Sequence, residues 1–447
     1  MNIKMKKSTA FLMLIIMLSV IFTGCAGGGA SGKPAPAGQN QIQSEANKDI
    51  SGEVVFWNYD TDYFQALADN FNKKFPNIKI NLVPVDGAEY FNKWLTSYSA
   101  GTDISDIGVL EETIFARMGN IKGAWEDLSK SPYNININDI LDGYKPLAIN
   151  DAGEVVGINE AVTSSGFAYK RDMAKTYLGV SEPDEVGKLL KTWDDYYNLS
   201  VKVYTESDGK DFLFPCIADL GAIIVNQKGV AIIDKDANID TQAITDVFTK
   251  LLKLKSVNAY DPQIPETSDP SYNATFSDGH HMFFGCPPWM IRYVIKLNDE
   301  NGSGNWGLIS APERGYCWGG TGFSVYSGSK NKMATFTFLK ECYFTVEGGE
   351  FYKQYTGGEI IPYKPFATDL TKVSNIDPYF ANQDVGKTIM GWMDEPGSAL
   401  KPASKYDGVM WGGLSEGERM MINGNPTVDE LVSAAVAYMK ENIPLVG

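Results

Sequence analysis

Residues 53–83 have the sequence EVVFWNYDTDYFQALADNFNKKFPNIKINLV, and this stretch decides the fold. The residues at 53–57 are mostly apolar and bounded by polar ones, which predicts a buried strand. Over residues 62–75 apolar side chains recur at helical spacing, at Phe64, Leu67, Ala68, Phe71 and Phe75. Pro76 ends this helix, and the alternation over residues 78–83 predicts a second strand.

The same order of elements continues after this stretch. Residues 90–99 predict a second helix, and residues 104–110 predict a third strand. Strands that alternate with helices are joined by right-handed crossovers, which predicts an α/β fold with a mainly parallel sheet flanked by helices. Ligands of such sheets bind beyond the carboxyl ends of the strands. We therefore expect a cleft near the residues at those ends, which are Asn58, Tyr59, Asp60, Glu111 and Glu112.

The first 24 residues have the pattern of a signal peptide. Residues 1–7 are basic, and residues 8–22 form an apolar run that is short for a membrane span. Small residues at 23 and 24 precede Cys25, a pattern that resembles the bacterial lipoprotein signal, in which Cys25 becomes the lipidated first residue. An ordinary secretory peptide with an incidental cysteine is the alternative. Residues 25–52 are rich in Gly, Pro and polar residues, which predicts a flexible tether.

The composition excludes one class of partner and bounds the number of domains. The chain has 447 residues, with 55 acidic against 39 basic side chains and a net charge of −16. A chain of this length forms two or three globular units at roughly 100–200 residues each. Nucleic-acid binding needs clustered Lys and Arg, so the acidic balance argues against it. Three of the lysines precede Cys25, so the chain without its signal is more acidic still.

Several further motifs follow the opening stretch in a fixed order. They are KWLTSYSAGTDISDIGVL (residues 93–110), GEVVGINEAVTSSGFAYKRDM (153–173), FSDG with MFFG and Trp289 (276–289), WGLISAP (306–312), and GGTGFSV followed by SKN (319–331). Their order and spacing over about residues 53–365 resemble the family 1 extracellular solute-binding proteins, the sugar-binding components of ABC importers. The chain is identified as a member of that family on these motifs taken together.

The resemblance implies two α/β lobes that close on a solute about a hinge. Crossing segments would lie near Glu160, near residues 311–316 and near residues 360–362. The N-terminal lobe would then hold residues 53–160 and 312–360. The C-terminal lobe would hold residues 161–311 and 361–447.

Aromatic residues are the main candidates for ligand contact. They make up 12% of the chain, and an aromatic plane beside carboxylates suits the apolar faces and polar edges of a sugar. Trp289 matches the cleft tryptophan of the resembled family, and the preceding prolines stiffen its loop. The further candidates are Trp318, Gly319, Gly320, Trp392 and Asp394, together with Tyr59, Asp60, Glu111 and Glu112. Core packing is the alternative for each aromatic ring, and a place at a helix start is the alternative for the two glutamates.

Enzyme hypotheses meet obstacles in the sequence. Residues 413–417, GLSEG, fit a hydrolase elbow, but that chemistry needs a histidine after the serine and the last histidine is His281. A glycosidase needs two carboxylates about 5–9 Å apart, for which Glu111 and Asp394 are the candidate pair. The cysteines after Cys25 are Cys216, Cys286, Cys317 and Cys342, and their spacing matches no metal or redox motif. We expect four mostly buried free thiols, although three disulfide pairings are possible.

These observations predict a substrate-binding lipoprotein of an ABC transporter. It would capture a carbohydrate, more specifically an oligosaccharide, and deliver it to the membrane permease subunits. It would act as a monomer without catalysis, cofactor, metal or nucleic acid. We expect it on the extracytoplasmic face of the cell membrane, held by the lipid on Cys25, at a Gram-positive cell surface. The alternatives are a lipid-anchored carbohydrate-active enzyme and a surface adhesion or scaffolding module.

Overall fold

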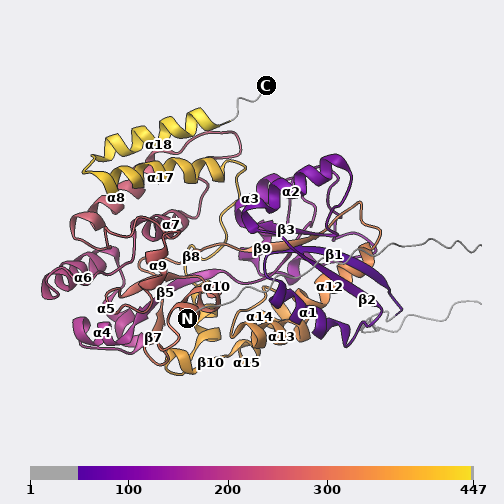
Figure 1. The fold of residues 1–447 in the computed structure, drawn as a ribbon, viewed down its shortest axis with the longest axis horizontal. Helices are drawn as coiled ribbons and strands as arrows, with labels where there is room; N and C mark the ends of the chain where they lie inside the picture. The colour runs from indigo at the N-terminus through magenta and orange to yellow at the C-terminus, as the bar shows by residue number, and fades with distance from the viewer. Residues whose placement is uncertain (1–48, 444–447) are drawn as a thin grey trace, which may run out of the picture. The chain divides into compact units, whose positions relative to one another are not determined.

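The structure is a computed structural model, and it describes residues 49–443. The predicted signal peptide, Cys25 and most of the predicted tether lie outside these residues. Within the described part, no helix has the length and apolar character needed to cross a membrane. The described residues form two groups of sheets and helices, which we call the first lobe and the second lobe (Figure 1).

The first lobe starts with the five elements that the opening sequence predicted. They are β1 (Gly52–Asn58), α1 (Thr61–Asn72), β2 (Ile78–Pro84), α2 (Gly87–Ala100) and β3 (Ile107–Glu111). β1 and β2 pair in parallel with Val54 opposite Ile80, and the apolar face of α1 is buried. The backbone amide of Asp106 donates to the carbonyl of Val55 over 2.8 Å, so the start of β3 lies beside β1. These five predicted elements are confirmed within a few residues.

The chain returns to the first lobe after it has formed much of the second lobe. β9 (Thr321–Val325) pairs with β3 on one side and with β4 (Ile158–Asn159) on the other. The ring of Phe338, which follows β9, lies 5.2 Å from the ring of Phe71 in α1. The other elements of this lobe are α3 (Glu112–Met118), η1 (Ile137–Asp139), η2 (Asp142–Leu147), α12 (Lys332–Tyr343), α13 (Val346–Thr356), α14 (Lys364–Ala367) and α15 (Leu370–Val373).

The second lobe surrounds one central strand. β5 (Ser164–Lys170) pairs with three others, namely β6 (Phe283–Cys286), β7 (Trp306–Ile309) and β8 (Tyr316–Cys317). The larger helices are α4 (Arg171–Leu178), α5 (Pro183–Leu189), α6 (Trp193–Glu206), α7 (Ile217–Lys228), α8 (Thr241–Ser256), α16 (Val385–Met393), α17 (Asp407–Asn423) and α18 (Val428–Asn442). The shorter elements are α9 (Pro270–Ala274), α10 (Pro288–Met290), the π-helix η3 (Ile291–Ile295), α11 (Lys296–Asn298), β10 (Ile376–Asp377), η4 (Pro378–Phe380) and β11 (Gln383–Asp384).

The core of the second lobe joins distant parts of the chain. One hydrophobic cluster runs from Phe167 on β5 through the helices α6, α7 and α8 to Met439 on α18. Figure 1 shows α17 and α18, in yellow, side by side and next to α8. Cys216, Cys286, Cys317 and Cys342 are all buried, as expected, and their thiols are free.

The predicted predominance of parallel pairing is wrong. Among the named strands of residues 49–443, β1 and β2 are parallel, while β9 runs antiparallel to β3 and β4. All three partners of β5 are also antiparallel to it. In the first lobe, the physical reason is that β9 enters from the second lobe and inserts between β3 and β4, and no crossover helix precedes it. The local alternation of strands and helices does not predict such a return.

The chain crosses between the lobes in three neighbouring segments. The amide of Glu160 donates to the carbonyl of Thr321 over 2.9 Å, and the amide of Val162 donates to the carbonyl of Ile360 over 2.7 Å. β8 still belongs to the second-lobe sheet, so the chain changes sheets between Cys317 and Thr321. The predicted lobe boundaries stay predictions.

Close packing at Gly166 gives a test of this core. A Cβ atom at Gly166 would lie 2.3 Å from the carbonyl oxygen of Ile309 and 2.4 Å from the ring of Trp392. We expect Gly166→Ala to lower the free energy of unfolding by about 1–3 kcal/mol, measured by urea denaturation, because a packed core resists added volume. Gly391→Ala is the control, since a Cβ there meets nothing within 4 Å and Ala favours the helix. Equal stability of Gly166→Ala and the parent would contradict this packing.

Candidate ligand-binding site

A cavity of about 530 Å³ lies where the crossing segments meet both lobes. We call it the interlobe cavity, and its lining residues are Tyr59, Asp60, Glu111, Glu112, Thr113, Glu160, Ala161, Thr163, Trp289, Arg292, Tyr293, Gly319, Gly320, Thr321 and Glu359. The first-lobe residues stand at the ends of β1 and β3, where topology predicted a cleft. A second cavity, of about 580 Å³, takes its walls from α5, β7, α16 and the loops beside them.

The structure brings together most of the predicted site residues. Seven of them line the interlobe cavity: Tyr59, Asp60, Glu111, Glu112, Trp289, Gly319 and Gly320. Trp318 is not among the lining residues, although its ring centroid lies 6.3 Å from that of Trp289. Trp392 is 2% exposed and lines the second cavity, and Asp394 is exposed and lines neither. Trp392 and Asp394 are therefore not placed with the others.

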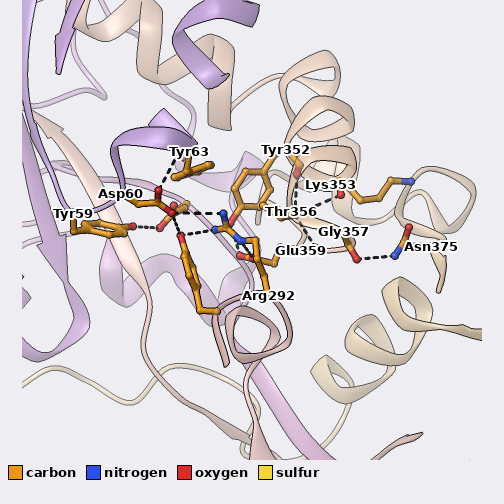
Figure 2. Close-up of polar contacts among 12 residues, drawn as sticks. Tyr59, Asp60, Tyr63, Arg292, Tyr352, Lys353, Thr356, Gly357, Glu359 and Asn375 are labelled. Atoms are coloured by element: carbon orange, nitrogen blue, oxygen red, sulfur yellow. Dashed lines mark hydrogen bonds and ion pairs between the residues drawn. The ribbon is translucent and has the colours of Figure 1, made fainter. Parts of the chain in front are cut away.

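Asp60 holds the first-lobe wall of the cavity in place. It caps the N-terminus of α1, where its Oδ1 accepts a hydrogen bond from the amide of Tyr63 over 3.1 Å. Its Oδ2 accepts a hydrogen bond of 2.7 Å from the hydroxyl of Tyr293 in the second lobe. The same oxygen lies 3.8 Å from Nη1 of Arg292. Asp60 thus connects the two lobes across the cavity (Figure 2).

Arg292 is the centre of the polar contacts in Figure 2. Its Nε donates to Oε1 of Glu359 over 3.2 Å, and its Nη2 donates to the hydroxyl of Tyr293 over 2.6 Å. The guanidinium also lies 4.0 Å from the ring centre of Tyr293 and 4.9 Å from that of Tyr63. Burial lowers the pKa of Arg292, but Glu359 and the neighbouring tyrosines raise it by more. Arg292 therefore stays charged and is held by partners from both lobes.

Glu160 is a buried carboxyl group whose titration lies near neutral pH. Burial, and next the nearby Glu359, raise the pKa of Glu160 to about 7. The hydroxyl of Tyr59 donates a hydrogen bond of 3.0 Å to its Oε2, which opposes that rise. Burial likewise raises the pKa of Glu359, whose Oε2 accepts a hydrogen bond of 2.7 Å from Tyr352. The crossing segments thus place two carboxyl groups in the lining of the cavity.

Glu111 and Glu112 form an acidic edge at the end of β3. Burial raises the pKa of both side chains. Oε1 of Glu112 lies 3.4 Å from Nζ of Lys401, a buried lysine that also lies 3.0 Å from Asp407. Within residues 49–443, no hydrogen bond or ion pair involves the Glu111 carboxylate. The two neighbouring acids therefore differ, because one is paired with a lysine and the other is free.

Trp289 presents a half-buried ring to the cavity. It lies in α10 directly after Pro287 and Pro288, and its Nε1 donates to the carbonyl of Trp318 over 3.0 Å. Gly319 has a φ of +77°, and a Cβ there would lie 3.2 Å from that Nε1. Glycine is needed at this position, because it permits both the positive φ and the close approach of the indole. The Gly-rich turn therefore fixes the edge of the Trp289 ring.

The sequence contains signals for several lining residues beyond the predicted ones. Arg292 and Tyr293 follow Trp289 at helical spacing of three and four residues, so one helix face carries all three. Trp289 lies in α10, and Arg292 and Tyr293 lie in the π-helix η3 that follows it. Such wide turns are frequent at functional sites. Glu160 marks the first predicted crossing, and Glu359 directly precedes the third. Proximity to a predicted hinge was the usable signal for these two acids.

The residues that the sequence offered for a catalytic site do not have a catalytic arrangement in the structure. Glu111 lines the interlobe cavity whereas Asp394 lies on the surface, so this predicted carboxylate pair does not face one site. Ser415 lies inside α17 and not at a strand-to-helix turn. In the described range, no group of three or more His, Cys, Asp and Glu side chains is placed to hold a metal ion.

A two-lobed α/β fold with an acidic, aromatic cavity at its crossing segments defines the class of solute-binding proteins. Residues 66–382 match the profile of the family described as bacterial extracellular solute-binding protein. The match covers more than half of the chain, and the chain belongs to this family. The family predicted from the sequence motifs is therefore confirmed.

Individual known proteins are similar to the chain at lower identity. It is 25% identical over 254 residues to the arabinooligosaccharide-binding protein of Bacillus subtilis, over 53% of each chain. The chain thus spans about half the length of this curated relative. A crystal structure of an extracellular solute-binding protein of family 1 superposes with a TM-score of 0.75 at 17% identity, over 87% of this chain and 99% of that one. The GacH receptor of Streptomyces glaucescens gives 0.69 at 19% identity, over 88% and 98%. These likenesses confirm the two-lobed fold.

The pKa of Glu160 predicts how stability depends on pH. Because the folded-state pKa of about 7 exceeds that of an unfolded glutamate, the folded protein binds more protons between about pH 4.5 and 7. Ionisation of Glu160 therefore lowers stability as the pH rises through this window. We expect Glu160→Gln to remove this loss and to gain on the order of 2–3 kcal/mol relative to the parent between pH 5 and pH 8.

Urea denaturation at several pH values measures this difference. Asp219 and Glu418 also have pKa values raised by burial, to about 7 and about 8, and they are present in both proteins. The difference between the two curves therefore reports Glu160 together with its electrostatic coupling to Glu359. Parallel curves for parent and variant would contradict a buried, weakly acidic Glu160.

Proposed function

We propose that this chain is the substrate-binding lipoprotein of an ABC importer that takes up an oligosaccharide. The interlobe cavity is the observation that carries the proposal, because it joins the Trp289 ring to carboxyl groups from both lobes and the crossing segments. A volume of about 530 Å³ lies within the usual range of small-molecule sites. Its walls come from both lobes, so a bound solute would contact both and favour their closure.

The chemistry of the lining favours a carbohydrate. Carboxylates accept hydrogen bonds from hydroxyl groups, and an indole ring packs against the apolar face of a sugar. The first supporting comparison is the relative named for arabinooligosaccharide binding, and the second is the GacH receptor, whose structure was determined with acarbose. The cavity of this chain offers groups that match such ligands.

Anchoring and delivery complete the proposal. The family is extracellular by its description, and the lipoprotein signal ahead of Cys25 suits attachment to the outer side of a cell membrane. We assign the protein to that face, at a Gram-positive surface, where it would pass its solute to permease subunits as a monomer. It has no catalytic role in this proposal. A lipid-anchored carbohydrate-active enzyme is the competing function, and turnover would separate the two.

Isothermal titration calorimetry tests the proposal. The mature chain would be titrated with arabinotriose, maltotriose and cellotriose and with their longer homologues, and each mixture would then be analysed for products. Saturable binding of at least one oligosaccharide without cleavage is the expected result. Cleavage of a bound sugar would favour the enzyme, and failure of every saccharide to bind would overturn the carbohydrate assignment.

Removal of the Trp289 ring tests the site itself. We expect Trp289→Ala to weaken binding of the preferred oligosaccharide by about tenfold or more, because a stacking face is lost. Trp411→Ala is the matched control, since Trp411 is a partly buried tryptophan on α17 that packs against the second-lobe core. Calorimetry on both variants measures the effect. Unchanged affinity in Trp289→Ala would remove the ring from the site.

A further inference from the structure

The charge balance of the interlobe cavity is strongly acidic. Of the described residues that line it, five carry carboxyl groups and one is basic. The five are Asp60, Glu111, Glu112, Glu160 and Glu359, and the basic residue is Arg292. Arg292 offsets one of these charges, Lys401 pairs with Glu112, and Glu160 is only partly ionised near neutral pH. The remaining acids still give the cavity a net negative charge, which acts more strongly at partly buried groups than in bulk water.

The single guanidinium is already occupied. Arg292 contacts Glu359 at 3.2 Å and lies 3.8 Å from Asp60, and its Nη2 donates to the hydroxyl of Tyr293. An anionic solute could bind Arg292 only by competing with these two carboxylates, which are fixed to both lobes. Among the described residues that line the cavity, there is thus no free cation with which to bind a carboxylate or a phosphate.

In contrast to the guanidinium of Arg292, the carboxylate of Glu111 is free to bind a ligand. Its neighbour Glu112 is paired with Lys401 at 3.4 Å, and Asp60, Glu160 and Glu359 each accept a side-chain hydrogen bond or an ion-pair contact. In the described part of the chain, the carboxylate of Glu111 has neither kind of contact, although it lines the cavity. A partly buried carboxylate without a partner is costly unless a ligand supplies a donor.

We infer that the interlobe cavity selects its saccharide by charge, with Glu111 receiving an amino group of the ligand and with acidic sugars excluded. This inference rests on the proposed function and names the solute class of the same cavity. Neutral saccharides still bind, because a hydroxyl group also donates to Glu111. A cationic saccharide gains an ion pair in addition, while a uronic acid meets repulsion from Glu111 and its acidic neighbours.

Matched saccharide trios test this inference on the full mature chain. Each trio consists of a neutral trisaccharide, its derivative with an amine in place of one terminal primary hydroxyl, and its derivative with a carboxylate at the same position. The neutral trisaccharides are arabinotriose, maltotriose and cellotriose. For the trisaccharide that binds in its neutral form, we expect the amine derivative to bind at least about tenfold more tightly than the carboxylate derivative. Raising sodium chloride from 0.05 to 0.5 M should weaken the amine form and leave the neutral form unchanged.

A variant then locates the effect. Glu111→Gln should weaken the amine form by about tenfold and the neutral form by less than about threefold, because glutamine keeps an acceptor oxygen without the charge. Glu441→Gln, the same substitution at an exposed position of α18, is the control and should change neither.

The failures of the two proposals are distinguishable. If a carboxylate form binds as tightly as its amine counterpart, or if Glu111→Gln leaves the amine form unaffected, selection by charge at Glu111 is wrong while saccharide binding stands. If no member of any trio binds, both the inference and the carbohydrate assignment are overturned.

Discussion

The partly buried guanidinium of Arg292 is the constraint on which the candidate site depends. A charge removed from water needs partners, and Arg292 finds them in Glu359 at the crossing segments and in Asp60 of the first lobe. These contacts place carboxyl groups from two distant regions of the chain around one cavity. They also occupy the one basic side chain of the described lining, so the remaining acids determine which solutes fit. The contacts of Arg292 therefore both link the two lobes and set the charge that the cavity presents to a solute.

Much of the first lobe could be predicted from the sequence because its signals are local. The apolar spacing of Phe64, Leu67 and Phe71 defines α1 within a few residues, and Pro76 separates it from β2. The ends of β1 and β3 indicated where Asp60 and Glu111 would lie, since strand ends in such sheets meet at one edge. The motifs distributed over the chain identified the family that the profile match confirms.

Other features depend on contacts between distant segments, which one sequence does not specify. The insertion of β9 between β3 and β4 joins residues more than 160 positions apart, and it makes both of these pairings antiparallel. Trp392 was a plausible ligand contact by residue type, yet it packs against Gly166 in the second lobe. Arg292 was not among the predicted site residues, because a single arginine forms no recognisable sequence motif. Its importance comes from the acids that surround it in space.

A crystal structure of the mature chain with a bound oligosaccharide is the most direct test of the proposed site. We predict a sugar ring against Trp289, hydroxyl groups at Asp60 and Glu111, and Arg292 still in contact with Glu359. A saccharide found instead in the second cavity, against Trp392 and α5, with the interlobe cavity empty, would contradict this prediction.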